Sequence, residues 1–345
     1  MDCLQDWPEP IVPVQSLEGG QVVPAQYIKP PPERPVLDRD VEPDWGPCVP
    51  VIDLGSLQGG EAGRRAIGSA CKEWGFFQVV NHGVSHELMA RVRELWREFF
   101  YLPMEEKKAY ANSPVSFEGY GSRLGVQKGA ILDWGDYYFL NFLPEMVKNH
   151  SKWPASPTLL RDTIEEYGAQ VIKLCHLLLK EISISLEVEE DFLHKALGGG
   201  GVGACMRANF YPRCPQPDLT LGLSPHSDPG ALTVLLPDDR VEGLQVRKGE
   251  EWFTIYPIPN AFIVNIGDQI QVLTNGNYKS VEHRVIVNSA KERLSLAFFY
   301  NPKDDILIEP AQEFVAPNKP PLYKKMAYKD YKLFIRSLGP RGKLL

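Results

Sequence analysis

The chain has 345 residues, 43% of them hydrophobic, which is enough for one large domain or two smaller ones with a substantial core. Its formal net charge is −7, and the phosphate backbone repels an acidic protein, which argues against nucleic-acid binding. No apolar run approaches the ~20 residues that cross a bilayer. The N-terminal sequence MDCLQDWPEP lacks the basic start and the apolar segment of a secretory signal.

The six cysteines are spread along the chain without a Cys-x-x-Cys pair, as is typical of reduced intracellular thiols. We therefore expect a cytoplasmic protein, with the nucleus as a second compartment. We also expect it to act on a small-molecule substrate, with no nucleic acid, no membrane and no obligate protein partner.

The first part of the chain is expected to be an extended arm followed by a mainly helical region. The arm covers 1–48, because its proline-rich stretch at 29–35 favours extended polyproline geometry and excludes a helix. Ser85 is the expected N-cap of a helix. The longest helix has an apolar stripe that we expect to pack against a sheet. The elements predicted before Gly198 are strands at 50–54 and 76–80 and helices at 61–73, 85–100 and 158–186.

From Ala204 onward the apolar pattern changes from a period of about 3.6 to a period of two, which is typical of strands. Eight short strands at this spacing predict a sandwich or jelly roll. With the helices braced on it, the fold class is α+β. The predicted strands are 205–211, 231–236, 243–247, 252–256, 261–266, 269–273, 279–287 and 292–300, before a last helix at about 328–337. The predicted regions are the arm at 1–48, a mainly helical region at 49–200, the jelly-roll core at 201–310, and a C-terminal helix and tail at 311–345.

The sharpest functional signal is a His-x-Asp motif, His226-Ser227-Asp228, with His283 lying 55 residues after Asp228. Side chains two apart on a strand lie on one face, so His226 and Asp228 can bind the same ion. Two imidazoles and one carboxylate are the ligand set of non-haem iron(II) oxygenases. Such a site leaves two positions for a chelating 2-oxo acid and one for dioxygen. For the motif alone, the alternative is a surface strand with two polar residues.

Two further strands place candidate ligand-binding residues on one face each. Arg293 and Ser295 are two apart, and the planar guanidinium fork of an arginine matches a carboxylate. Arg207, Asn209 and Tyr211 also alternate on one face. Together with the histidine motif, these residues favour a metal site, and the other five histidines are expected to be structural or solvated.

On these residues the chain resembles the plant iron(II)/2-oxoglutarate-dependent dioxygenases, the group that contains anthocyanidin synthase and gibberellin oxidases. The resemblance covers about 51–340. Its motifs are Pro50-Val51-Ile52-Asp53-Leu54, Trp74-Gly75-Phe76-Phe77, Asn81-His82-Gly83, Asn209-Phe210-Tyr211-Pro212, His226-x-Asp228, His283 and Arg293-x-Ser295. The resemblance implies a double-stranded β-helix core and dioxygen as oxidant, with ascorbate in support. It also implies iron(II) on His226, Asp228 and His283, and 2-oxoglutarate on Asn209, Tyr211, Arg293 and Ser295.

Within that group the chain looks most like the jasmonate-induced oxygenases, which hydroxylate jasmonic acid at C-12 and lower the active hormone pool in plant defence. The stretches 131–139, 221–230 and 295–302 carry this likeness. It implies that the substrate contacts Arg207, Phe139 and Phe299, with Lys332 where the family pattern has an arginine. A lysine keeps the charge but lacks the bidentate fork.

Lys332 and Arg336 are four apart and share a helix face, so they can form a lid over an anionic substrate. The alternative is a solvated helix face. For Arg207 the alternative is an ion pair with a helix carboxylate, and for Phe139 and Phe299 it is core packing.

Three functions follow from these residues. The first is hydroxylation of a small carboxylic acid, with jasmonic acid giving 12-hydroxyjasmonic acid. A charge-assisted hydrogen bond from Arg207 contributes about 1.5–3 kcal/mol, which favours an acid over its neutral analogue. The second is oxidation of a flavonoid or another phenolic compound, as in anthocyanidin synthase. The third is binding of a small molecule without catalysis.

Overall fold

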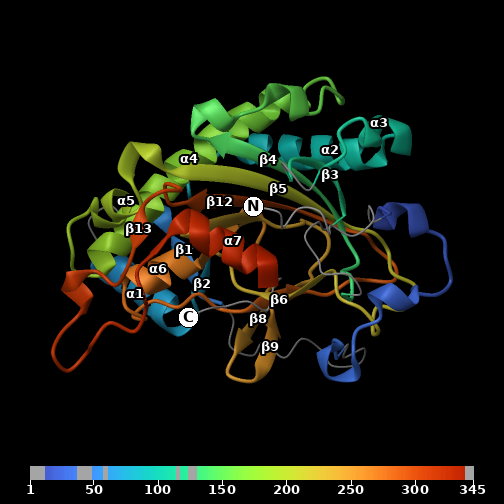
Figure 1. Cartoon of the computed structure of the whole chain (residues 1–345). Coiled ribbons are helices and arrows are strands. Elements are labelled where there is room, and N and C mark those ends of the chain that lie inside the picture. The colour runs from blue at the N-terminus through green and yellow to red at the C-terminus, as the bar shows by residue number, and fades with distance from the viewer. Residues whose placement is uncertain (1–11, 37–48, 57–60, 114–116, 123–129, 339–345) are drawn as a thin grey trace.

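The computed structural model describes residues 12–36, 49–56, 61–113, 117–122 and 130–338, except for the side chains of 336–338. Helices cover one face of a large sheet, and a smaller sheet packs against the opposite face (Figure 1). This is the predicted α+β class with a jelly-roll core. Among the described residues, no helix is both long and apolar enough to cross a bilayer.

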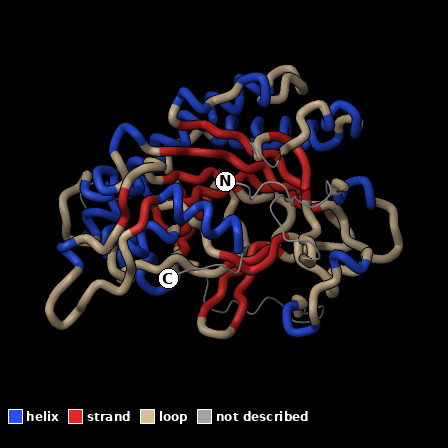
Figure 2. Tube along the Cα trace, viewed as in Figure 1, coloured by secondary structure: helices blue, strands red, loops and turns tan. Residues whose placement is uncertain are grey.

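Most strands belong to two sheets, which Figure 2 shows in red. Within the described residues, the large sheet has the order β1-β2-β10-β7-β12-β5-β4-β3 and the small sheet has the order β6-β11-β8-β9. The strands of the large sheet are β1 (Val51–Asp53), β2 (Phe76–Val80), β3 (Gly119–Ser122), β4 (Asp136–Leu143), β5 (Gly203–Tyr211), β7 (Leu232–Leu236), β10 (Phe262–Ile266) and β12 (Arg293–Asn301). The others are β6 (Leu223–His226), β8 (Leu244–Lys248), β9 (Glu251–Thr254), β11 (His283–Val285), and the pair β13 (Leu307–Ile308) and β14 (Met326–Ala327).

The helices pack mainly on one face of the large sheet. They are α1 (Glu61–Glu73), α2 (His86–Tyr101), α3 (Met104–Lys108), α4 (Leu160–Ser185), α5 (Phe192–Ala196), α6 (Asp268–Leu273) and α7 (Tyr328–Leu338). The predicted cap of α2 is confirmed, because Ser85 Oγ accepts a hydrogen bond from the Leu88 N–H at 3.3 Å. The long helix α4 contacts β7 and β12 as well as α1 and α2, so its apolar stripe packs against a sheet, as predicted.

Strand alternation gives the large sheet two different sides. On β4, β5, β7, β10 and β12, even-numbered side chains such as Phe210, Val234 and Phe298 join the buried cluster under the helices. We call this the helix side. Odd-numbered side chains of β5, β7, β10 and β12, such as Asn209 and Ser295, line a pocket that faces the small sheet. We call this the pocket side.

The described part of the arm, 12–36, lies at one end of the two sheets (blue in Figure 1) and is anchored there by buried side chains. Val14 and Tyr27 are fully buried in the cluster on the pocket side. The Val14 N–H donates to Asp136 Oδ1 at 2.8 Å, and the Tyr27 ring lies 5.3 Å from that of Trp134. The described part of the arm therefore packs on the sheets, with 3-10 turns at Val14–Leu17 and Ala25–Tyr27 interrupting the predicted extended chain. Residues 1–11 and 37–48 lie outside the described part of the chain.

Several predicted elements were wrong. The stretch at 269–273 is the short helix α6 and not a strand, because a short buried apolar run fits either structure and periodicity cannot separate them. A single 3-10 turn, η3, forms at Pro31–Glu33 inside the proline-rich stretch, since proline is tolerated where no N–H donor is needed. Strands β3, β4, β6, β13 and β14 were not predicted. The mainly helical region contributes β1 to β4 to the large sheet.

Candidate active site

The three predicted metal ligands come together where the small sheet meets the pocket. His226 ends β6, and His283, the first residue of β11, is its direct cross-strand partner. Asp228 follows two residues after β6 has ended, so the shared face comes from strand pairing and not from one continuous strand. Asp228 Oδ1 lies 3.7 Å from the Nε2 atom of each histidine, and the ligand atoms of all three residues lie within 4.8 Å of one another.

Backbone carbonyls fix the orientation of both imidazoles. His226 Nδ1 lies 2.9 Å from the Ser224 carbonyl oxygen, and His283 Nδ1 lies 3.2 Å from the Val281 carbonyl oxygen. Only a protonated Nδ1 can donate to a carbonyl, so the lone pair is on Nε2 in both rings. A second hydrogen bond of this kind is typical of metal-binding histidines. Both rings therefore direct a nitrogen ligand toward Asp228.

The Asp228 carboxylate is buried, and one of its oxygens is already bound. Oδ2 accepts hydrogen bonds from Thr233 Oγ1 at 2.5 Å and Asn265 Nδ2 at 2.8 Å. Burial alone would raise the pKa of Asp228, but the positive charge of the two imidazoles when they are protonated, together with these hydrogen bonds, holds the pKa below its usual value. The ionised Oδ1 thus faces the two histidines. Two neutral nitrogens and one carboxylate oxygen fit an iron(II) ion, and no fourth His, Cys, Asp or Glu joins this group within the described residues.

The four residues predicted to bind 2-oxoglutarate lie next to one another on the pocket side. Strands β5 and β12 are antiparallel, with Arg293 opposite Tyr211 and Ser295 opposite Asn209. The prediction that each group shares one face is therefore confirmed. Arg293 is buried, and burial lowers its pKa below the usual value. Its Nη1 lies 3.3 Å from Ser295 Oγ, while its Nε has no hydrogen-bond partner in the described part of the protein. A buried donor without an acceptor costs free energy. Arg293 is therefore suited to bind a carboxylate, which supplies the missing acceptor.

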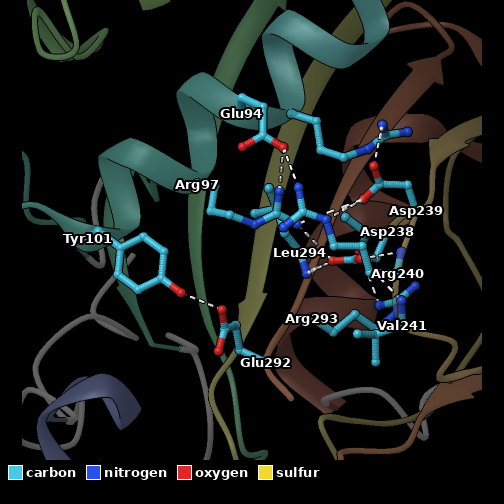
Figure 3. Close-up of polar contacts among 12 residues, drawn as sticks. Glu94, Arg97, Tyr101, Asp238, Asp239, Arg240, Val241, Glu292, Arg293 and Leu294 are labelled. Carbon is cyan, nitrogen blue, oxygen red and sulfur yellow. Dashed lines mark hydrogen bonds and ion pairs between the residues drawn. The ribbon is translucent and has the colours of Figure 1, made fainter.

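A buried ion pair holds the start of β12 against helix α2 (Figure 3). Asp238 Oδ2 accepts from the Leu294 N–H at 2.7 Å and lies 3.4 Å from Arg97 Nη2 of α2. Its Oδ1 accepts from the N–H groups of Arg240 and Val241, which closes the loop between β7 and β8. The hydrogen bond to Leu294 anchors the backbone next to Arg293 and so helps to fix the position of its guanidinium.

One pocket joins the metal ligands to the predicted 2-oxoglutarate residues. Apolar side chains from both sheets form the rest of its wall, so the polar groups are concentrated at a few positions. The residues that line it are Phe76, Arg207, Asn209, Tyr211, Leu223, His226, Asp228, Thr233, Leu235, Leu244, Asn265, His283, Val285, Arg293, Ser295, Ala297 and Phe299.

Known proteins match this chain over almost its whole length. Residues 49–156 match the model of the non-haem dioxygenase in morphine synthesis N-terminal region, and residues 202–302 match the 2OG-Fe(II) oxygenase superfamily. Jasmonate-induced oxygenase 4 of Arabidopsis thaliana is 58% identical, over 98% of this chain and 96% of the relative. Flavonol synthase 1 of Crocosmia x crocosmiiflora is 39% identical, over 90% and 92%. The crystal structure of JOX2 in complex with 2OG, Fe and JA superposes with a TM-score of 0.91 at 56% identity, covering 98% of this chain and 97% of that one.

The chain is a member of the jasmonate-induced oxygenases, within the 2OG-Fe(II) oxygenase superfamily. It is therefore a 2-oxoglutarate- and iron(II)-dependent dioxygenase that uses dioxygen, as the sequence predicted. Binding without catalysis is set aside as a function.

Of the substrate residues predicted for this jasmonate-induced oxygenase, Arg207 has the clearest position. It lies on β5 between Ala297 of β12 and Phe139 of β4, and its guanidinium carbon is 4.1 Å from the centre of the Tyr137 ring. Arg207 forms no ion pair with a carboxylate among the described residues, and its Nε has no hydrogen-bond partner there. The alternative of a structural ion pair is thus not supported, and the cation is available to a ligand.

The two predicted aromatic contacts lie on the pocket side. Phe299 lines the pocket and also packs against the cluster that contains Tyr211 and Leu235. Phe139 is half-buried and is the cross-strand neighbour of Arg207. Phe139 is not among the residues that line the pocket, whereas Phe299 is, and the substrate contacts of both residues stay predictions.

The predicted lid pair has a different outcome. Lys332 lies on α7, and its Nζ bonds Asp304 and not a group in the pocket. Lys332 also does not line the pocket, so the structure does not place it at the substrate site. The side chain of Arg336 lies outside the described residues. The bond to Asp304 matches the alternative, a solvated helix face.

Sequence reasoning missed the residues that hold the metal ligands in place. Thr233 and Asn265 bind Asp228, and an asparagine within the buried apolar strand β10 was a readable signal. Asp268 was assigned to no element, although it is fully buried. Its backbone N–H bonds the Asp228 carbonyl oxygen at 2.8 Å, and its side chain accepts from Ser227 Oγ at 3.2 Å and from the Tyr331 hydroxyl of α7 at 2.7 Å.

Proposed function

We propose that the protein hydroxylates jasmonic acid at C-12 to give 12-hydroxyjasmonic acid. One observation carries this choice of substrate: a second cation, Arg207, lies on the same pocket wall as Arg293 and has no carboxylate partner among the described residues. A substrate with a carboxylate satisfies this cation. The relatives named jasmonate-induced oxygenases, at 53–58% identity, support the same choice.

In this proposal His226, Asp228 and His283 hold iron(II). Arg293 and Ser295 bind the distal carboxylate of 2-oxoglutarate, and Asn209 and Tyr211 of the adjacent strand complete that end of the pocket. When bound there, iron(II) and 2-oxoglutarate supply the oxidation: dioxygen and 2-oxoglutarate are consumed, succinate and carbon dioxide are released, and one oxygen atom is inserted into a substrate C–H bond. The protein binds, orients and excludes water.

The spacing of the two cations allows two carboxylates to bind at once. Arg207 lies opposite Ala297, which is four residues from Arg293 along β12. At ~3.3 Å per residue, this separates the two backbone positions by about 13 Å. The substrate carboxylate at Arg207 is therefore kept away from the 2-oxoglutarate site. Leu235 and Phe299 provide apolar surface beside it for the hydrocarbon part of the substrate.

Oxidation of a flavonoid or another phenolic compound is the second candidate. It is supported by relatives such as flavonol synthase 1, but these are only 39–40% identical. A neutral phenolic substrate would leave the Arg207 guanidinium without an anionic partner in the pocket, at a cost in binding free energy. The first candidate is therefore preferred.

An aerobic assay with iron(II), ascorbate and 2-oxoglutarate separates the two candidates. Jasmonic acid, its neutral methyl ester and a neutral flavonoid are compared, with mass spectrometry for the gain of one oxygen atom. We expect Arg207→Gln to lower kcat/KM for jasmonic acid by about 10–100-fold, the equivalent of one charge-assisted hydrogen bond, and to leave the ester little changed.

Arg213→Gln is the matched control, because Arg213 is an exposed arginine nearby on the chain that pairs with Glu18 at the surface. It is expected to have wild-type kinetics with all three compounds. Wild-type turnover of jasmonic acid by Arg207→Gln, or faster turnover of the flavonoid than of the acid by the wild type, would contradict the proposal.

A further inference from the structure

The N-terminal arm contributes a buried lysine close to one of the metal ligands. Lys29 is only 2% exposed, and its Nζ lies 2.8 Å from Asp133 Oδ1 and 2.9 Å from Ser224 Oγ. Ser224 Oγ in turn donates to the same Asp133 oxygen at 2.5 Å. The three side chains form a closed triangle from three distant parts of the chain. A buried ammonium and carboxylate are tolerated only when paired and hydrogen-bonded in this way.

This triangle is connected to the metal site through the backbone of Ser224. Ser224 lies on β6, and its backbone carbonyl is the acceptor for His226 Nδ1 at 2.9 Å. The backbone N–H of Lys29 also donates to the Leu219 carbonyl oxygen at 2.8 Å, in the segment that leads into β6. The arm is therefore hydrogen-bonded at two points, Leu219 and Ser224, to the segment that ends at His226. Groups that orient a metal-binding histidine through its second nitrogen affect metal affinity.

We propose that Lys29 is a positioning residue for the iron site. Through Asp133 and Ser224, its ammonium fixes the carbonyl that keeps the His226 ring turned with Nε2 toward Asp228. The inference rests on the assignment of the metal ligands in the proposed function, but not on the identity of the substrate. The arm then completes the metal site, in addition to covering the pocket-side core.

The alternative is a lysine that only fastens the arm, and the chain contains a matched example. Lys107 is 3% exposed, and its Nζ bonds Gln15 Oε1 of the arm at 2.9 Å and the Phe100 carbonyl oxygen at 2.7 Å. Both lysines are buried and both hold the arm. Only the bonds of Lys29 lead to a metal ligand in the described part of the structure.

The test compares Lys29→Met with Lys107→Met in the full-length chain. Co²⁺ is titrated into each metal-free protein without 2-oxoglutarate, and binding is followed by its visible d–d absorption, which reports coordination and needs no turnover. We expect Lys29→Met to weaken Co²⁺ binding by about 10–100-fold and to change the band shape, because outer partners of metal ligands have effects of this size. Lys107→Met is expected to bind Co²⁺ like the wild type, although its melting temperature falls. Equal Co²⁺ affinity in the two variants would overturn the proposal.

A second variant covers the case in which Lys29→Met does not fold, since it removes the Lys29 ammonium from a buried carboxylate. Lys29→Met/Asp133→Leu removes both charges and restores an apolar contact. We expect this protein to fold and still to bind Co²⁺ about tenfold or more weakly. A folded double variant with wild-type Co²⁺ affinity would overturn the inference. His226→Ala distinguishes the two levels of failure: if it too binds Co²⁺ normally, the ligand assignment is wrong, and the role of Lys29 falls with it.

Discussion

The two sides of the large sheet are built from the same strands and have opposite properties. On the helix side, Leu296 and Phe298 of β12 are fully buried among apolar neighbours. On the pocket side of the same strand, Arg293 and Ser295 are also buried, but one guanidinium nitrogen lacks a partner among the described residues. The helix side therefore stabilises the fold, while the pocket side keeps polar groups available for ligands at a cost in stability. Adjacent residues of one strand therefore have different roles, because their side chains point to opposite sides of the sheet.

The largest effect is expected from the metal ligands on the pocket side. Asp228→Ala removes the only carboxylate of the ligand group. We expect turnover of 2-oxoglutarate to fall to the level of a metal-free control. The metal-free protein should also unfold at a lower temperature, because Thr233 and Asn265 lose their acceptor in a buried site. Succinate release and thermal unfolding measure the two quantities. Turnover at the normal rate would contradict the assignment of the iron site.

On the helix side, the expected effect is on stability and not on catalysis. Phe298→Ala removes a fully buried ring and should cost about 3–5 kcal/mol of the free energy of unfolding, measured with urea. Its neighbour Phe299 points into the pocket and is only half-buried, so Phe299→Ala should cost less stability and more activity. If both variants lose stability and activity in the same proportion, the division into two sides is wrong.

Arg293 is buried and has a donor without a hydrogen-bond partner among the described residues. Its effect on 2-oxoglutarate binding can therefore be separated from its effect on stability. Arg293→Met should raise the KM for 2-oxoglutarate by about 10–100-fold, because a charge-assisted bond of 1.5–3 kcal/mol is lost. Without 2-oxoglutarate, the free energy of unfolding should stay the same or increase, since a buried cation is replaced by an apolar chain of similar length. A large loss of stability with an unchanged KM would show that Arg293 is a structural residue.

The smallest effect concerns a buried histidine packed on the helix side, whose polar atoms all have partners. His82 Nδ1 accepts from the Val84 N–H at 3.1 Å, and Nε2 donates to the Asn260 carbonyl at 2.8 Å, an arrangement that needs a neutral ring. Burial lowers the pKa of His82 below its usual value near 6.5.

The unfolded state therefore binds a proton at a higher pH than the folded state does. The stability contributed by neutral His82 is complete above about pH 6.5 and is lost as the pH falls toward the lower folded-state pKa. Chemical unfolding between pH 5 and 8 should show this slope, and it should be flatter in His82→Gln. His150→Gln, at an exposed histidine, is the control and should keep the wild-type slope. An unchanged slope in His82→Gln would assign the pH dependence to another group.

The sequence by itself determined the fold class, the family and the alternation of side chains. The period of two along β5 and β12 was enough to predict that Arg207, Asn209 and Tyr211 lie on one face of their strand. It also predicted that Arg293 and Ser295 lie on one face of theirs. Strand alternation is a local property of an extended backbone, so it is encoded in adjacent residues. The cap of α2 at Ser85 is local in the same sense.

Tertiary structure alone decided which segments meet. Ser224, Asp133 and Lys29 are far apart in the sequence, and nothing in their own neighbourhoods indicates that they form one buried group beside His226. The same holds for Asp268 and Tyr331, and for the stretch at 269–273, whose apolar run fits a strand until its surroundings make it a helix. Contacts of this kind depend on how the sheets pack and on which polar groups must be satisfied once they are buried, and a local pattern does not contain that information.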